Sequence, residues 1–205
     1  MKKCTFYFLV FIFILFMGRF SKATLIEWPI TEGGNGHFYE IVLVSEGITW
    51  ENANTAATNV GGYLATITSS EENAFVHNLA VSKTEYWIDS GITGPWLGGY
   101  QLDGSPEPAG GWQWVTGEPF SYTNWTNKEP DNGTGGTENR LHFWDGRTPL
   151  PYAPTWNDRN SGYGNEPHAY VVEYVPEPAT ILLFGVGAVM LSRRKQQFFN
   201  EVLLE

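Results

Sequence analysis

The chain has a single cysteine and little positive charge. Of its 205 residues only Cys4 is a cysteine, and twelve Lys and Arg stand against twenty-two Asp and Glu. Because Cys4 is the fourth residue, just before the first apolar run, the rest of the chain has no disulfides and its core has to be stable without them. The scarcity of Lys and Arg excludes the basic face that binds phosphates, so nucleic acid is not expected as a partner.

The first residues have the layout of a secretory signal. Met1-Lys2-Lys3 is basic, residues 5–17 are almost wholly apolar, and Ser21-Lys22-Ala23 offers a small-x-small cleavage site. The apolar run is shorter than the roughly 20 residues that a membrane-spanning helix needs. We therefore expect residues 1–23 to be a cleaved signal peptide, with an uncleaved anchor as the alternative.

The other end of the chain carries a second targeting pattern. Pro176, Glu177 and Pro178 precede an apolar stretch, residues 179–191, and Arg193 and Arg194 follow it. This layout of residues 175–195 resembles the PEP-CTERM sorting signal of certain Gram-negative-type bacteria, which an exosortase reads. The resemblance implies export, transient membrane insertion through residues 179–191, and a final place in the cell envelope, at the outer surface or in the extracellular matrix. A plain C-terminal anchor is the alternative, and residues 196–205 form a tail beyond the signal.

The segment between the two signals is long enough for one domain with a core of its own. Residues 24–178 contain five Lys and Arg and twenty Asp and Glu, a net charge of −15. This excess of negative charge fits a solvated acidic surface or, as a more specific interpretation, the binding of cations. Gly33, Gly34 and Gly36 indicate that residues 24–36 are a linker.

Hydrophobic periodicity predicts strands and helices in the remaining chain. Two helices are expected, one capped by Thr49 with Trp50, Ala53, Ala57 and Val60 on its apolar face, and one opened by a capping box of Ser69 and Glu72. Strands are expected at residues 37–42, 63–67, 96–99 and 169–174, and the last of these should pair with the first.

Two acidic motifs in the second half of the chain offer oxygen ligands. Lys128-Glu129-Pro130-Asp131-Asn132 and Thr155-Trp156-Asn157-Asp158 flank Glu138-Asn139. The oxygen donors are Glu129, Asp131, Glu138, Asn157 and Asp158. Hard oxygen ligands suit Ca²⁺, which takes six to eight of them at roughly 2.3–2.6 Å. Each motif alone would also make an ordinary turn.

The order of these motifs resembles that of C-type lectin-like domains. Further matches are Gly61-Gly62-Tyr63-Leu64-Ala65-Thr66-Ile67 with Ser69 to Asn73, Trp96-Leu97-Gly98-Gly99, and Trp112 to Trp125. The resemblance covers residues 37–174. It implies an α+β fold with two helices, small antiparallel sheets and a long loop region.

The resemblance also implies a site. One Ca²⁺ would be held by Glu129, Asp131, Glu138, Asn157 and Asp158, and sugar hydroxyls would be bound by Glu129, Asp131, Glu138 and Asn157. A cis bond before Pro130 and Trp156 anchored in the core are expected. Glu72 and Glu173 match a second calcium position of some family members, although a helix cap and a surface strand residue are the simpler interpretations.

These patterns favour an exported, calcium-dependent carbohydrate-binding protein associated with the cell surface or with exopolysaccharide. The Glu129-Pro130-Asp131 loop offers two acceptors and no amide donor, so it is neither the mannose-type nor the galactose-type loop. A protein-binding or structural module, in which Ca²⁺ only orders the loops, is the alternative. No nucleophile motif is present, and we do not expect an enzyme.

Overall fold

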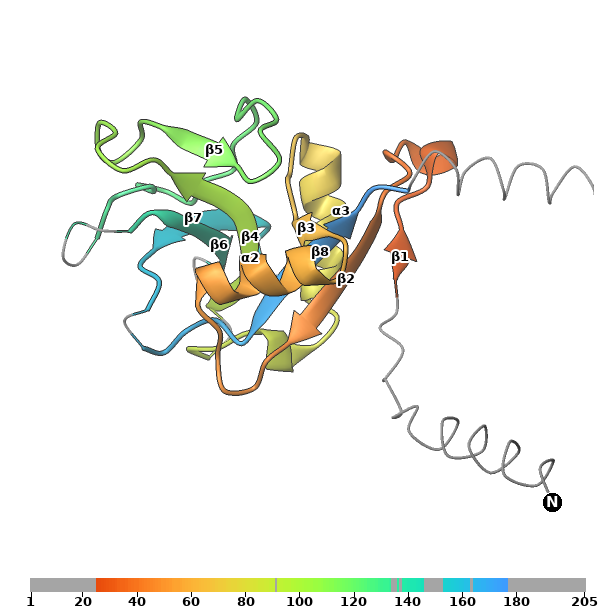
Figure 1. The fold of residues 1–205 in the computed structure, drawn as a ribbon, viewed down its shortest axis with the longest axis horizontal. Coiled ribbons are helices and arrows are strands. Elements are labelled where there is room, and N and C mark those ends of the chain that lie inside the picture. The colour runs from red at the N-terminus through yellow and green to blue at the C-terminus, as the bar shows by residue number, and fades with distance from the viewer. Residues whose placement is uncertain are drawn as a thin grey trace, which may run out of the picture.

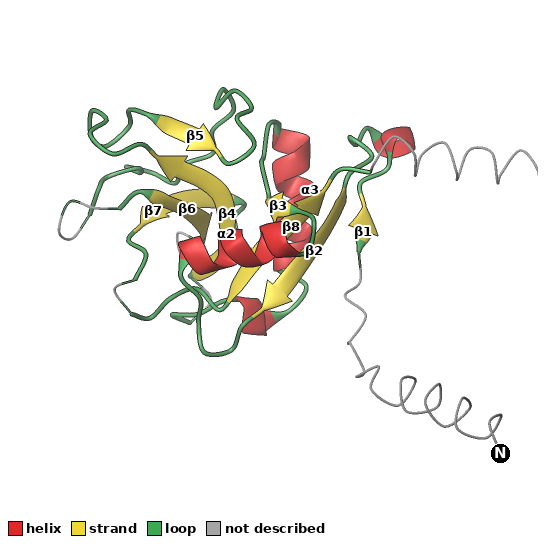
Figure 2. Cartoon of the chain, in the orientation of Figure 1, coloured by secondary structure: helices red, strands yellow, loops and turns green. Residues whose placement is uncertain are grey.

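The computed structural model describes residues 25–90, 92–133, 136, 138–145, 153–162 and 164–176. Within them a mixed sheet is flanked by two α-helices, which confirms the expected α+β class (Figures 1 and 2). The expected signal peptide, the sorting-signal residues Glu177, Pro178, Arg193 and Arg194, the apolar stretch and the tail lie outside the described residues.

The sheet has eight strands in the order β1-β2-β8-β4-β6-β7, with β3 paired to β8 and β5 paired to β4. The expected small antiparallel sheets are joined into one, because β4 and β8 pair in parallel at Trp96 and Tyr170. The elements are β1 (Ile26–Glu27), η1 (Ile30–Glu32), β2 (Phe38–Leu43), α2 (Trp50–Asn59), β3 (Tyr63–Leu64), α3 (Ser70–Ala80), η2 (Thr84–Tyr86), β4 (Thr93–Gln101), β5 (Trp112–Trp114), β6 (Arg140–Trp144), β7 (Thr155–Arg159) and β8 (Ala169–Tyr174).

Both helices begin where the capping residues predict. The Thr49 hydroxyl accepts from the Asn52 N–H at the start of α2, and the Ser69 hydroxyl accepts from the Glu72 N–H at the start of α3. The expected apolar face of α2 is wrong at Val60, which is 60% exposed. The helix ends one residue earlier, and Val60 lies in the turn that Gly61 continues with a φ of 82°.

Strand β8 lies at the centre of the fold and separates two hydrophobic clusters. Tyr170 and Val172 pack with Trp50 and Trp96 on the side of α2, while Ala169 and Val171 belong to the larger cluster that includes α3. This alternation follows from the two-residue period of a strand. The two helices therefore cover opposite faces of the sheet at β8, as Figure 1 shows.

Residues 25–36 pack as part of the domain rather than forming the expected linker. Ile26 pairs with Tyr39 to add β1 at the sheet edge, and the Trp28 ring stacks on Phe75 of α3 at 5.6 Å. Gly33 and Gly36 have positive φ values of 84° and 78°. These glycines bend the chain back toward β2, a use that composition alone does not distinguish from a linker.

The predicted pairing of the first long strand with the last is confirmed. Strands β2 and β8 are antiparallel from Phe38 opposite Tyr174 to Leu43 opposite Ala169. The described chain therefore begins and ends on the β1 side, whereas the loop after β5 reaches the far side beside β6 and β7 (Figure 1). Neither helix in the described ranges is long and apolar enough to cross a membrane.

Candidate metal centre

Strand β7 carries one half of the site and is held by its tryptophan. The Trp156 side chain is fully buried, as the sequence predicts, and its Nε1 donates to Asn73 Oδ1 at 2.8 Å. Its ring lies edge-on to Trp114 at 5.7 Å and to Trp125 at 5.9 Å. Asp158, two residues on and so on the same face of the strand, is buried as well.

The acidic loop is fastened alongside this strand. Trp125 forms a parallel bridge with Trp156, and the Thr126 N–H donates to the Trp156 carbonyl at 2.9 Å. The Glu129 N–H then closes a turn onto the Thr126 carbonyl at 3.0 Å. The Glu129–Pro130 peptide bond is cis, as expected from the resemblance.

Asp158 is the point on which the loop converges. Its Oδ1 accepts from the Asp131 N–H at 3.2 Å and its Oδ2 from the Asn132 N–H at 2.9 Å. The Asn132 side chain in turn accepts from the Glu138 N–H at 3.0 Å, and Asp131 Oδ1 accepts from the Gly133 N–H at 2.9 Å. The loop is thus organised by backbone donors and not by cationic side chains.

Three carboxylates come together at this place. Glu129, Asp131 and Asp158 each offer an oxygen, and these oxygens lie within 4.8 Å of one another. Glu129 Oε2 is buried without a hydrogen-bond partner among the described residues. Burial, followed by the charges of Asp131 and Asp158, raises the pKa of Glu129 to about 7. Burial also raises the pKa of Asp158, although its two backbone donors oppose that shift.

Glu138 lies against the same cluster. A Cβ on Gly133 would stand 2.3 Å from Glu138 Oε2, so the carboxylate occupies the space that a side chain there would need. Burial and the charges of Asp158 and Asp131 raise the pKa of Glu138 to about 7, with Arg159 acting in the opposite direction. Four carboxylates therefore share one region with too little compensating charge for all to ionise freely.

Asn157 adjoins Asp158 on β7, opposite His142 in the strand register. Its Oδ1 is buried and has no hydrogen-bond partner in the described part of the chain. The unpaired oxygen of Glu129, within a cluster of carboxylates, fits a hard cation such as Ca²⁺. The sequence motifs thus bring Glu129, Asp131 and Asp158 together, with Glu138 against the same cluster and Asn157 next to Asp158 along β7.

Asn132 is not among the expected site residues. Its backbone donates to Asp158 while its side chain holds Glu138, in a left-handed conformation with a φ of 55°. The Asp131-Asn132-Gly133 stretch is the signal that could have revealed it, because Asn and Gly favour that conformation. His77 and His142, which no sequence motif singled out, are buried with ring nitrogens that lack partners among the described residues.

Comparison with known families decides the identity of the fold. Residues 46–147 match the model of the lectin C-type domain, and residues 175–196 match that of the PEP-CTERM protein-sorting motif. The chain is a C-type lectin domain protein with a PEP-CTERM motif. The family is non-catalytic, in agreement with the expectation, and the motif marks an exported protein sorted to the cell envelope.

Individual relatives resemble the lectin C-type part of the chain, in sequence for one and in fold for two others. A perlucin-like protein of Mytilus galloprovincialis is 32% identical over 114 residues, which cover 55% of this C-type lectin domain protein and 63% of the relative's own length. The carbohydrate-recognition domain of cow CD23 has a TM-score of 0.53 at 24% identity, covering 70% and 91% of the two chains. A calcium-independent type II antifreeze protein has a TM-score of 0.51 at 19% identity, covering 75% and 98%.

Proposed function

We propose that this protein binds carbohydrate in a calcium-dependent manner at the cell surface or in exopolysaccharide. The observation that carries the proposal is the gathering of Glu129, Asp131 and Asp158 within 4.8 Å, with one oxygen of Glu129 buried and without a hydrogen-bond partner in the described part of the chain. Solved neighbours of this fold include both a carbohydrate-recognition domain crystallised in the presence of an oligosaccharide and a calcium-independent protein. The support therefore comes from this chain's own donor set and not from the fold.

The calcium ligands would be Glu129, Asp131, Glu138, Asn157 and Asp158. When bound, the ion supplies coordination sites for two hydroxyl oxygens of a sugar. The carboxylates of Glu129, Asp131 and Glu138 accept hydrogen bonds from those hydroxyls, and the Asn157 amide is the one donor among the five ligands. The backbone N–H groups of Asp131 and Asn132 are already used on Asp158, so they hold the loop and do not bind sugar.

The location of the site suits display from an envelope. The sorting motif starts at residue 175, on the β1 side, and the acidic loop lies at the opposite side of the domain (Figure 1). An exosortase would recognise Pro176, Glu177, Pro178, Arg193 and Arg194 during a transient insertion of residues 179–191. The lectin site would then face away from the membrane, toward glycan or exopolysaccharide.

A glycan array read with Ca²⁺ and with EDTA tests the proposal. The full chain in a nonionic detergent should bind a subset of neutral glycans, and EDTA or Asp158→Asn should abolish the signal. Asp103→Asn, an isosteric change at an exposed aspartate, is the matched control and should bind as the wild type does. Binding that survives both EDTA and Asp158→Asn contradicts a calcium-bridged sugar.

A second candidate function is a protein-binding or structural module. The observation in its favour is the side chain of Asp131. It offers a second acceptor where an amide would donate to a sugar hydroxyl, and its Oδ1 already accepts a hydrogen bond from the Gly133 N–H. In this case Ca²⁺ orders the loop and a protein surface contacts it. A defined envelope protein that binds wild type and Glu129→Gln equally, with no glycan signal, would favour this candidate.

A further inference from the structure

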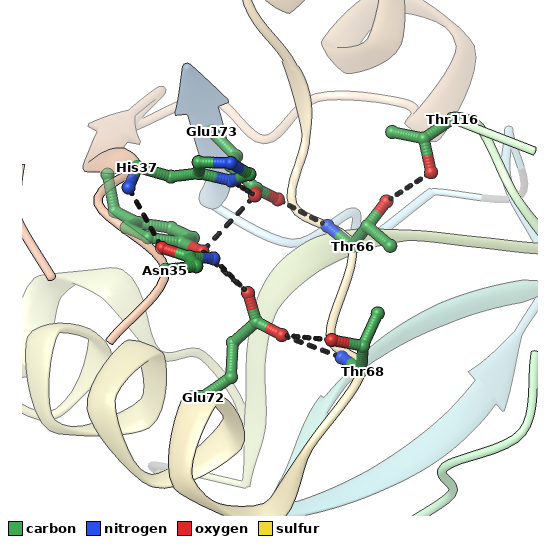
Figure 3. Close-up of polar contacts among 8 residues, drawn as sticks. Asn35, His37, Thr66, Thr68, Glu72, Thr116 and Glu173 are labelled. Carbon is green, nitrogen blue, oxygen red and sulfur yellow. Dashed lines mark hydrogen bonds and ion pairs between the residues drawn. The ribbon is translucent and has the colours of Figure 1, made fainter. Parts of the chain in front are cut away.

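A second pair of acidic side chains is buried far from the loop site. Glu72 of α3 and Glu173 of β8 are each 2% exposed, so the simpler expectation of a surface strand residue is wrong for Glu173. Glu72 is also no ordinary capping-box residue, because its carboxylate does not return to Ser69. Figure 3 shows both carboxylates facing a segment that includes Asn35 and His37.

Each oxygen of Glu72 accepts two hydrogen bonds. Oε1 accepts from the Tyr39 hydroxyl at 2.6 Å and from the Asn35 amide at 3.0 Å. Oε2 accepts from the Thr68 N–H at 2.7 Å and from its hydroxyl at 2.9 Å. A carboxylate has about four lone-pair positions, so the acceptor capacity of Glu72 is filled by protein donors.

Both oxygens of Glu173 have protein donors, and the Tyr39 hydroxyl lies nearby. Its Oε1 lies 2.6 Å from His37 Nδ1 and 3.2 Å from the Tyr39 hydroxyl, and its Oε2 accepts from the Thr66 N–H at 2.9 Å. The hydrogen bond with Glu173 raises the pKa of His37, while burial opposes that shift. We assign the shared proton to His37 Nδ1, which makes this contact a charge-assisted hydrogen bond.

These bonds leave Glu72 no acceptor position for a metal ion, and each oxygen of Glu173 already has a protein donor, His37 or Thr66. A cation between Glu72 and Glu173 would have to displace Tyr39, Asn35 or His37, all of which come from one short stretch before and in β2. In the described ranges, the group formed by Glu129, Asp131 and Asp158 is the one cluster of three or more acidic, His or Cys side chains with metal-like spacing. The second calcium position that the family implies does not fit this chain.

We infer that residues 35–39 take the place of a cation between α3 and β8. His37, Asn35 and Tyr39 supply the donors, and Glu173 favours the protonated form of His37. The same stretch closes the hairpin whose Trp28 stacks on Phe75, so it latches the N-terminal hairpin onto the domain. The domain core is therefore independent of calcium even where the loop is not, and this holds whether or not the loop site binds sugar.

The first experiment removes the loop site and asks whether any calcium response is left. Thermal unfolding of the full chain carrying Asp158→Asn, in nonionic detergent, is compared in millimolar Ca²⁺ and in EDTA. The two midpoints should coincide. A calcium-dependent rise that a further Glu173→Gln change removes would overturn the inference, because it would place a cation between the two glutamates.

The second experiment tests the latch in EDTA, where the loop site plays no part. His37→Ala leaves a buried carboxylate without its shortest hydrogen bond and should lower the midpoint by about 10 °C. Asn35→Ala should lower it by less. Glu32→Ala, an exposed change in the same hairpin, is the control and should leave the midpoint unchanged. A His37→Ala midpoint equal to that of the control would overturn the latch.

Discussion

Asp158 Oδ2 accepts a hydrogen bond of 2.9 Å from the backbone N–H of Asn132, twenty-six residues earlier in the chain. This bond joins the end of the acidic loop to the strand that Trp156 anchors. It brings carboxylates from two separate motifs into one cluster before any ion binds. The cost of that arrangement is charge repulsion, and the predictions below follow from it.

Glu129→Gln should change stability in opposite directions with and without calcium. In EDTA at pH 8, loss of one charge from the cluster should raise the free energy of unfolding by up to about 1 kcal/mol, since solvent screens part of the repulsion. In saturating Ca²⁺ the same change removes a ligand and should lower it. Chemical denaturation in both conditions checks the prediction, with the exposed Glu32→Gln as control. A change of the same sign in both conditions would contradict it.

Calcium affinity should fall steeply as the pH drops below 7. Glu129 and Glu138, each with a pKa of about 7 in the metal-free protein, have to release their protons before they bind the ion. Each obligatory proton lowers the affinity about tenfold per pH unit once the pH is below that pKa. Calorimetric titration at pH 8, 7 and 6, in buffers of different ionisation enthalpy, measures both the affinity and the protons released. An affinity that is constant across this range would contradict the prediction.

The metal-free protein should lose stability on acidification through its buried histidines. Burial lowers the pKa of His142 to about 3 and of His77 to about 4, from 6.5. Between pH 6.5 and those values the unfolded chain binds more protons, so the free energy of unfolding falls by about 1.4 kcal/mol per pH unit for each histidine. His142→Phe should flatten this limb of the stability profile. An unchanged slope would contradict a buried neutral imidazole.

The acidic cluster should lower the stability of the metal-free protein as the pH rises. The folded pKa values of Glu129 and Glu138, about 7, lie above the ordinary 4.5. The stability that the protonated carboxyls of Glu129 and Glu138 contribute in EDTA is therefore fully present below pH 4.5 and is lost as the pH rises through 7. Glu138→Gln should remove part of that loss. Urea denaturation in EDTA from pH 5 to 8 measures it, and an unaltered alkaline limb would count against the cluster.

Gly98→Ala should destabilise the domain without touching the loop site. A Cβ at this position in β4 would lie 2.3 Å from the Leu64 carbonyl oxygen. The Gly98 N–H donates to Ala65 at 2.8 Å, so the strand cannot move away without losing a bond. We expect a loss of about 3 kcal/mol or more, measured by denaturation. An unchanged unfolding midpoint would show that β3 and β4 are not this close.

The elements that the sequence predicted well are those with strong local signals. The caps at Thr49 and Ser69, the strand at residues 169–174 and the buried Trp156 all follow from short-range patterns. The acidic residues of the loop could be found from their types and spacing, because oxygen donors and turn residues occur together.

The rest depends on contacts between distant parts of the chain. Nothing local tells that Glu72 and Glu173 meet, or that His37 lies 2.6 Å from Glu173 across 136 positions. The hairpin of residues 25–36 has a linker-like composition and is ordered by Trp28 packing on Phe75. Such pairings are tertiary contacts, and hydrophobic periodicity and helix caps do not predict them.

Thermal unfolding of the wild type and Asp158→Asn, each in Ca²⁺ and in EDTA, tests the central proposal most directly. An ion that binds only the folded state at 100 times its Kd adds about 2.7 kcal/mol of stability. The wild-type midpoint should therefore be several degrees higher in Ca²⁺ than in EDTA. The Asp158→Asn midpoint should be the same in both conditions. Equal wild-type midpoints in Ca²⁺ and EDTA would contradict a calcium site in the acidic loop.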